Sequence, residues 1–382
     1  MRFIRQGMLA AMSATALFPQ NIMFEEMPAL QLANDKIELA ILTRGSTIAS
    51  IVLRDDPAKL NPLWNPIRMS RELNQKSSFG AGLGHFLCVD GFGPVSAEEK
   101  AAGMPGHGEA HLQQWETRHA AKEGNTAVLT LAAKLPLVQE QIVRTMRLID
   151  GENVVYVETQ LESLLPFDRP VCWAEHATIG SPFLEPGVTV VDMAAKRAKT
   201  RPYEPNERGL PHRLTSGEEF TWPNAPALDG KKVDLRTAPS PPNSGDHTAC
   251  LMDASRKWVF VTALHPGKRL LLGYVFRPQE YPWTQNWENY PATLKLARGM
   301  EFSTMPFDVP RREAVQQNSM FGTPLFRWLP AKSKIETRFL MFFTRVPDGF
   351  QQVDDVRLEN GLLTIEDRKA GRRVELRAAR EL

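Results

Sequence analysis

Cysteine is scarce in this chain, and the few cysteines present fit no cysteine-based scaffold. The 382 residues include only Cys88, Cys172 and Cys250. An odd, sparse count argues against a disulfide framework, although a single disulfide stays open. The wide spacing matches no zinc-binding pattern. We expect three buried small apolar side chains and no bound metal.

The chain also lacks an excess of charge of either sign. Its 46 basic and 44 acidic residues give a formal net charge of +2, without a long run of like charge. Nucleic acid and anionic membranes are therefore not expected partners. No stretch approaches the ~20 apolar residues of a membrane span. This balance favours a neutral, polar small molecule as the ligand.

Several catalytic signatures are missing. The sequence contains no phosphate-binding loop, no dinucleotide-type glycine pattern opening a helix, no nucleophile-elbow serine and no zinc-protease motif. Gly80–Gly82 and Gly91–Gly93 are better explained as turns. His85 and Asp90, between these turns, either serve the fold or line a pocket.

The first 20 residues allow two interpretations. Met1–Arg5 is basic, Gly7–Phe18 is mostly apolar, and Ala11–Ala16 offers small residues for cleavage. This pattern is typical of a short secretory signal, and an ordinary tail or helix is the alternative. A cleaved signal would place the chain in the periplasm or outside the cell, and an intact tail in the cytoplasm.

The chain is rich in residues that break regular secondary structure. Its 29 prolines and 25 glycines leave most segments too short for long helices. Alternating apolar residues from Gln141 to Ser163, with Asp150-Gly151 as the turn, predict a hairpin. Arg144 interrupts the apolar face of its first strand. Further strands are expected at Lys36–Leu42, Ala127–Lys134, Trp258–Leu264, Leu270–Phe276 and Ile335–Thr344. Near the C-terminus, Val356–Leu363 and Val374–Leu376 include or flank turn-rich segments that contain Asn360-Gly361 and Ala370-Gly371.

Such regular short strands indicate an all-β protein of stacked antiparallel sheets. One region breaks the pattern, because Arg201–Gly245 is rich in Pro, Asn, Glu and Gly with weak periodicity. We expect a long, functional or mobile loop there. No repeat of fixed period and no clean linker is present, so residues 25–382 are expected to form a single domain.

Two histidine clusters are candidates for chemistry. Glycines flank His107 in Gly103–His111, which lets a ligand approach closely, and Glu109 and Trp115 follow as possible sugar contacts. A turn histidine without a role is the alternative. In the second cluster, a strand through Val171–Ala177 turns Trp173 and Glu175 to one face and His176 to the other. Trp173 beside a histidine fits contact with the apolar face of a sugar, and the alternative is a core tryptophan with a hydrogen-bonded histidine.

Two later segments complete the candidates. Tyr281–Tyr290 holds Trp283 and Trp287 among amides and carboxylates, which suits a polyhydroxylated ligand or a packed loop over a sheet edge. Glu301 stands among apolar neighbours, where desolvation would raise its pKa toward that of a useful general base. A surface strand glutamate is the alternative.

Together these motifs resemble a known family. Four motifs occur in the order seen in galactose mutarotase-like proteins, between about residues 30 and 346: Asn61-Pro62-Leu63-Trp64, His107-Gly108-Glu109-Ala110, Glu175-His176 with Pro182-Phe183-Leu184, and Arg298-Gly299-Met300-Glu301-Phe302. The resemblance implies a β-supersandwich and a sugar in an open cleft. It implies Glu301 as the base at the anomeric hydroxyl, His176 as the acid at the ring oxygen and His107 beside that oxygen. No cofactor is implied.

The sequence departs from the well-known mutarotases in two places. Ser78–Gly82 stands where their arginine-containing motif would be, and Asp246 is a weak candidate for their substrate-binding aspartate. Two other functions stay open. One is a non-catalytic sugar-binding protein with Trp115, Trp283 and Trp287 as platforms. The other is a sugar-phosphate epimerase, for which Arg277 and Arg298 are the nearby cations.

Overall fold

The computed structural model describes residues 19–75, 82–203 and 209–382. The predicted signal or tail therefore lies almost entirely outside the described residues, as do Ser78–Ala81 of the segment that replaces the arginine motif. No helix among the described residues has the length and apolar character needed to span a bilayer. The prediction of one domain over 25–382 stays a prediction.

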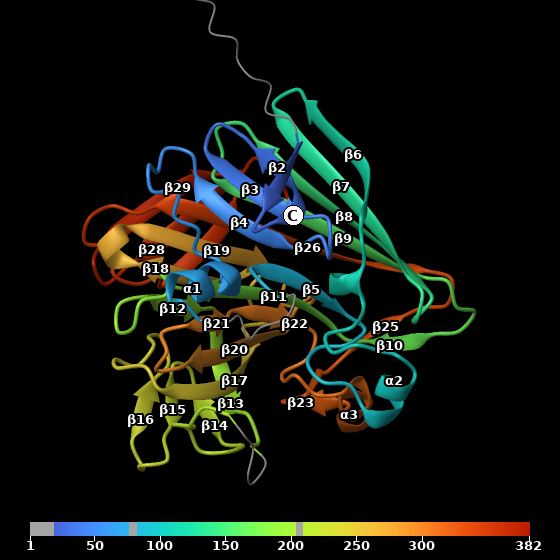
Figure 1. Ribbon diagram of the computed structural model, residues 1–382. Helices are drawn as coiled ribbons and strands as arrows, with labels where there is room; N and C mark the ends of the chain where they lie inside the picture. Colours follow the sequence, from blue (N-terminus) through green and yellow to red (C-terminus); the bar gives the residue numbers. More distant parts are fainter. Residues whose placement is uncertain (1–18, 76–81, 204–208) are drawn as a thin grey trace, which may run out of the picture.

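Two large antiparallel sheets dominate the structure (Figure 1). The first has fourteen strands, of which β22 (Glu301–Ser303) pairs with both β11 and β20. The other thirteen are, in spatial order, β1 (Gln20–Phe24), β2 (Met27–Ala33), β3 (Ile37–Leu42), β4 (Ile48–Leu53), β5 (His85–Val89), β11 (Trp173–Gly180), β21 (Ala297–Gly299), β20 (Trp283–Tyr290), β17 (Ser244–Met252), β13 (Ala195–Thr200), β14 (Glu219–Thr221), β15 (Asn224–Pro226) and β16 (Lys232–Asp234).

The second large sheet has eight strands. The described residues also form three small sheets and several short helices. The eight are, in order, β12 (Val190–Met193), β18 (Val259–His265), β19 (Leu270–Phe276), β26 (Lys334–Arg345), β9 (Val154–Ser163), β8 (Glu140–Ile149), β7 (Thr126–Leu135) and β6 (Glu116–Glu123). The small sheets are β10 (Arg169–Val171) with β25 (Arg327–Leu329), β23 (Ser319–Met320) with β24 (Thr323–Pro324), and β27 (Asp355–Glu359) with β28 (Leu362–Asp367) and β29 (Arg372–Arg377). The α-helices are α1 (Pro66–Glu72), α2 (Ala97–Ala101) and α3 (Arg311–Gln317), and single 3-10 turns cover Ala110–Leu112 and Pro266–Lys268.

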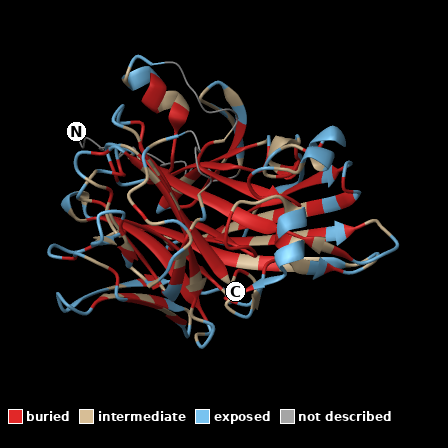
Figure 2. Cartoon of the chain, turned by 90° about the horizontal axis from the view of Figure 1, so that it is seen from below, coloured by how far each residue is buried: buried red, intermediate tan, exposed pale blue. Residues whose placement is uncertain are grey.

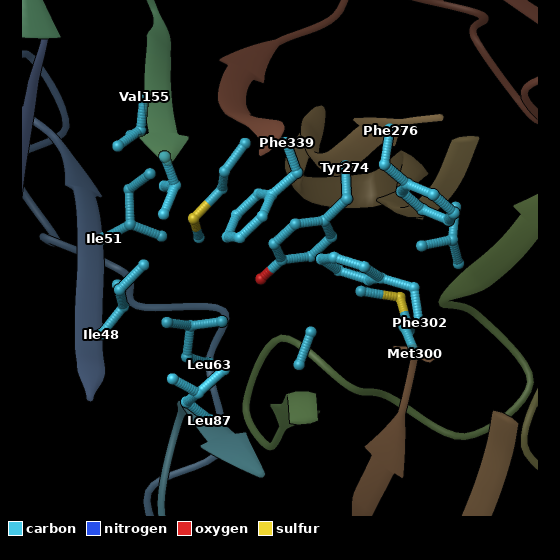
Figure 3. Packing of buried hydrophobic residues seen from close by; sticks show 14 of the residues in the cluster. Ile48, Ile51, Leu63, Leu87, Val155, Tyr274, Phe276, Met300, Phe302 and Phe339 are labelled. Atoms are coloured by element: carbon cyan, nitrogen blue, oxygen red, sulfur yellow. The ribbon is translucent and has the colours of Figure 1, made fainter. Parts of the chain in front are cut away.

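The main apolar core lies between the two large sheets. Figure 3 shows Ile48 and Ile51 of β4 on one side and Tyr274 and Phe339 of β19 and β26 on the other. A second core forms where the C-terminal sheet packs on the opposite face of the second sheet. Strand β19 is therefore buried on both faces, which is why Leu270–Phe276 is apolar without alternation. Figure 2 shows this burial through the central strands.

The predicted hairpin is present as β8 and β9, with a turn at Asp150-Gly151. Arg144, the residue that interrupts its apolar face, is 1% exposed and reaches across the core to Glu175 of β11. Its guanidinium nitrogens lie 3.2 and 3.0 Å from the two carboxylate oxygens of Glu175. His85 Nε2 lies 2.8 Å from the same carboxylate. A buried ion pair thus joins the two sheets.

The prediction of a loop over Arg201–Gly245 is wrong in part. The described portion contains β14, β15 and β16, which extend the edge of the first sheet beyond β13. These strands have three residues each, too few for a periodic pattern to register. A small apolar cluster around Leu214, Ala225 and Leu235 holds them together.

Candidate active site

A cavity of about 410 Å³ opens on the face of the first sheet that points away from the main core. Four of the eight histidines of the chain line it. Its lining residues are Trp64, Gly82, Phe86, Phe92, His107, His111, His176, His247, Trp287, Glu301 and Asp308. The structure thus brings His107, His176 and Glu301 together with Trp287, one of the predicted aromatic contacts.

Alternation along β11 turns His176 into this cavity. Trp173 belongs to the main core and Glu175 meets Arg144 there, so the odd-numbered positions face inward and His176 faces the opposite way. Thr178 Oγ1 lies 2.9 Å from His176 Nδ1. The imidazole also stacks on Phe86, with ring centroids 4.1 Å apart and planes 21° from parallel. Both contacts fix the ring with Nε2 free to act.

Glu301 begins β22, which lies between β11 and β20 and so places the carboxylate beside His176. Oε1 of Glu301 lies 3.3 Å from Nε2 of His176. The contact lacks hydrogen-bond geometry, and this Oε1 has no hydrogen-bond partner among the described residues. Burial, with a smaller contribution from the negative charge of Asp308, raises the pKa of Glu301 well above its ordinary value.

Burial has the opposite effect on His176, because its charged form is the protonated one. Desolvation, followed by repulsion from His107, lowers the pKa of His176 well below 6.5. A carboxylic acid and an imidazole whose pKa values are both shifted toward the neutral forms therefore lie side by side. Such a pair can accept a proton at one atom and donate one at another.

His107 sits in a left-handed turn with φ of 65°. The Gly93 N–H donates to His107 Nδ1 at 3.1 Å, so this nitrogen carries no proton. In the neutral imidazole the proton is then on Nε2, which makes that atom a donor. Burial lowers the pKa of His107 and favours this neutral form. Its ring centroid is 5.4 Å from that of His176.

Gly108 allows this turn to approach the first sheet. A Cβ added at Gly108, whose φ is +72°, would lie 1.8 Å from the Val89 carbonyl oxygen. We expect Gly108→Ala to destabilise the protein by roughly 1–3 kcal/mol more than Gly124→Ala, because of this overlap. Gly124 is the matched control, since its φ is +61° and nothing lies within 4 Å of the added Cβ. Urea unfolding measures both, and equal losses would contradict the proposed packing.

The sequence interpretation missed three lining residues that carry polar groups. His111 was part of the first glycine-rich cluster without being assigned a role. Burial, then repulsion from His107 and Arg44, lowers its pKa to about 4. On β17, His247 lines the cavity and the neighbouring Asp246 does not. Strand alternation would have raised this possibility only if the strand had been known.

Asp308 is the third missed residue, and Arg201 and His247 hold it in place. Its carboxylate accepts a short contact from Arg201 and lies 3.2 Å from His247 Nδ1. Burial alone would raise the pKa of Asp308, but the charges and hydrogen bond of these neighbours outweigh it and lower the pKa. No local sequence signal links these residues, because they come from separate segments.

Five of the predicted sugar contacts lie outside the cavity. Trp115 is 2% exposed in the main core, and its Nε1 donates to the Ala110 carbonyl. Trp173 and Trp283 are fully buried in apolar clusters. In these three cases the apolar ring serves the core rather than a ligand.

Glu109 and Arg277 are the other two. The Glu109 carboxylate accepts backbone N–H bonds from Leu137 and Val138, so it fixes a loop. Arg277 stacks on Trp258 in a different crevice, against the C-terminal sheet. Proximity in sequence to Tyr281–Tyr290 therefore did not bring Arg277 to the cavity.

Comparison with known proteins shows which solved structures share this architecture. No protein-family model matches the sequence, and no curated protein is significantly similar to it in sequence. Solved structures do match. A candidate aldose 1-epimerase from Klebsiella pneumoniae aligns with a TM-score of 0.60 at 12% identity, over 84% of this chain and 80% of that one. A galactose mutarotase-like protein from Clostridium acetobutylicum aligns with a TM-score of 0.56 at 12% identity, over 86% and 99%.

The chain has the galactose mutarotase-like fold. A candidate aldose 1-epimerase from Escherichia coli K12 matches in the same way, with a TM-score of 0.56 at 12% identity over 83% of this chain and 99% of that one. The prediction of an all-β supersandwich is confirmed. At this level of identity the mutarotase-like fold establishes architecture, and the chemistry must be argued from the residues of the cavity.

Proposed function

We propose that the protein interconverts the anomers of an aldose by general acid and base catalysis, as an aldose 1-epimerase does. The observation that carries this proposal is the approach of His176 Nε2 and Glu301 Oε1 to 3.3 Å at the wall of the cavity. Burial shifts the pKa values of the two groups in opposite directions, which suits an acid and a base that exchange roles.

In the proposed reaction, the single proton of the pair first moves from Glu301 to His176. Glu301 then takes the proton of the anomeric hydroxyl while His176 gives its proton to the ring oxygen. The electron pair of the O–H bond forms the C1 carbonyl, and the bond between C1 and the ring oxygen breaks. Rotation about C1–C2 turns the other face of the aldehyde toward the ring hydroxyl. Closure reverses both proton transfers, so the enzyme returns to its starting state. The Nε2–H of His107 is a suitable donor to the ring oxygen.

The ligand that suits the cavity is uncharged. Among the described lining residues there is no arginine or lysine, so no permanent positive charge lines the cavity to bind a phosphate. Arg298, one of the two cations considered for a sugar phosphate, is fully buried and donates to Asn286 and to the carbonyls of residues 235 and 236. Trp287 and Trp64 supply aromatic surface for the apolar C–H face of a sugar ring.

The test is anomer exchange, followed by NMR, on a panel of free aldoses that includes glucose and galactose. Enzyme-dependent exchange above the spontaneous rate supports the proposal. Sugar binding without exchange would instead indicate a non-catalytic carbohydrate-binding protein. That alternative has lost support, since two of its three platforms, Trp115 and Trp283, lie in the core.

The pH dependence of exchange is expected to be bell-shaped, because the active pair carries one proton. Uptake of a second proton by the pair stops the reaction at acidic pH, because Glu301 then stays protonated and cannot act as the base. Loss of the remaining proton stops it at alkaline pH, because His176 then has no proton to give. Since burial lowers the first pKa below 6.5 and raises the second above 4.5, the acid limb should lie below pH 6.5 and the alkaline limb above pH 4.5. The measurement is kcat/KM against pH after subtraction of the spontaneous rate, and a monotonic profile would contradict the shared proton.

A further inference from the structure

A second cavity adjoins the first. It has a volume of about 170 Å³ and shares the side chains of Trp287, His247 and Asp308 with the cavity that holds Glu301. Since three side chains wall both spaces, the two cavities are direct neighbours. The proposed chemistry, carried by His176, Glu301 and His107, makes no use of this second space.

We propose that the second cavity is a subsite for a second, uncharged sugar ring, so that the substrate is the reducing end of a short oligosaccharide. The inference rests on the proposed function, because it takes the first cavity as the place of the reacting ring. The anomeric hydroxyl of that ring must stay free to face Glu301. The second ring is therefore attached through another carbon.

Trp287 is the side chain that connects the two subsites. It is half-buried on β20, and its indole lies 6.2 Å from the His176 ring and 6.1 Å from the Trp64 ring, between centroids. Trp64 and His176 wall only the first cavity. An aromatic surface that continues from the reacting pocket into the next one suits the apolar C–H faces of consecutive sugar rings.

The second cavity offers hydrogen-bonding groups for hydroxyls. Asn289 presents an amide that can donate and accept. The Tyr203 ring stacks on His212, with centroids 3.5 Å apart and planes at 17°, and its hydroxyl accepts a hydrogen bond from the backbone N–H of His247 at 2.9 Å. His247 Nε2 is buried without a hydrogen-bond partner among the described residues.

The pairing of charged side chains around the second cavity favours a neutral ring there. Asp308 pairs with Arg201, and Asp246 lies 2.7 Å from Arg213, which also makes a short contact with Glu288. Arg201, which lines this cavity, and Arg213, which holds two of its carboxylates, thus both have carboxylate partners, and among the described residues no unpaired arginine lines the cavity to bind an acidic sugar or a phosphate. A polyhydroxylated, uncharged ring fits that balance.

The first experiment compares exchange rates of disaccharides and monosaccharides. We expect at least one of maltose, cellobiose, lactose and melibiose to show kcat/KM about tenfold or more above those of glucose and galactose, from one or two added hydrogen bonds. Asn289→Ala should lower this disaccharide preference about threefold to tenfold, the loss expected for one neutral hydrogen bond. His212→Ala, which removes the ring stacked on Tyr203, should lower it too.

The control is Asn224→Ala, the same substitution at an exposed residue of β15 that lines neither cavity, and it should keep the wild-type preference. The second experiment measures binding of methyl α- and β-cellobioside and methyl α- and β-maltoside against methyl glucosides by calorimetry. These glycosides cannot open, so their binding is independent of catalysis. Tighter binding of the disaccharide glycosides that Asn289→Ala weakens supports the subsite.

The outcomes separate the two proposals. Exchange of monosaccharides, with no disaccharide preferred in exchange or binding, overturns the second subsite and leaves the proposed function. Disaccharide binding that depends on Asn289, without exchange of any sugar, overturns the proposed function and supports the subsite. Neither binding nor exchange overturns both.

Discussion

Replacing Glu301 by glutamine is expected to lower kcat for anomer exchange by roughly 10²–10⁴-fold, the usual contribution of a positioned general base. Glutamine keeps the size and the polar oxygen of the side chain but cannot take the anomeric proton. Because burial already disfavours the charged form of Glu301, the amide should cost little stability. The measurement is NMR anomer exchange on the best substrate of the panel.

Two comparisons make this result specific. Glu313→Gln, the same change on the exposed surface of α3, should leave exchange at the wild-type rate. Thermal unfolding of Glu301→Gln should match that of the wild type, so that lost exchange reflects chemistry. If Glu301→Gln keeps most of the wild-type rate, Glu301 is not the base.

Arg144→Met is expected to destabilise the protein by about 3–5 kcal/mol, the cost of leaving a buried carboxylate without its partner. Arg144 is 1% exposed and Glu175 is fully buried. Burial opposes the ionisation of Glu175, but Arg144 and His85 more than offset it and lower its pKa to about 2. The measurement is the free energy of unfolding in urea at neutral pH.

Controls and pH sharpen this prediction. Arg144→Met with Glu175→Gln should recover much of the loss, because no charge is stranded. Arg118→Met, which breaks an exposed pair with Glu116, should cost less than ~1 kcal/mol.

The pH dependence of stability gives a separate check. The folded-state pKa of Glu175 is depressed, so the contribution of Glu175 to the free energy of unfolding is present above the ordinary pKa of 4.5 and is lost as pH falls toward 2. The gap between wild type and Arg144→Met should shrink over that range, and a constant gap would contradict the linkage.

The two predicted clusters of tryptophans show what sequence patterns can and cannot decide. Alternation along Val171–Ala177 correctly turned Trp173 and His176 to opposite faces. Alternation does not say which face is the core, and the predicted sugar contact Trp173 lies in the core. Trp283 and Trp287 have the same composition around them, yet one is fully buried and the other lines both cavities.

The sequence by itself determined the all-β class, the hairpin at Asp150-Gly151 and the order of the motifs that contain His107, His176 and Glu301. These follow from local alternation, turn residues and short patterns, which are properties of neighbours along the chain. Only the tertiary structure decided that His247 and Asp308 join the cavity, that Arg277 lies elsewhere and that Arg144 meets Glu175. Those contacts join strands far apart in sequence, and burial depends on which strands pair and which face the sheets enclose.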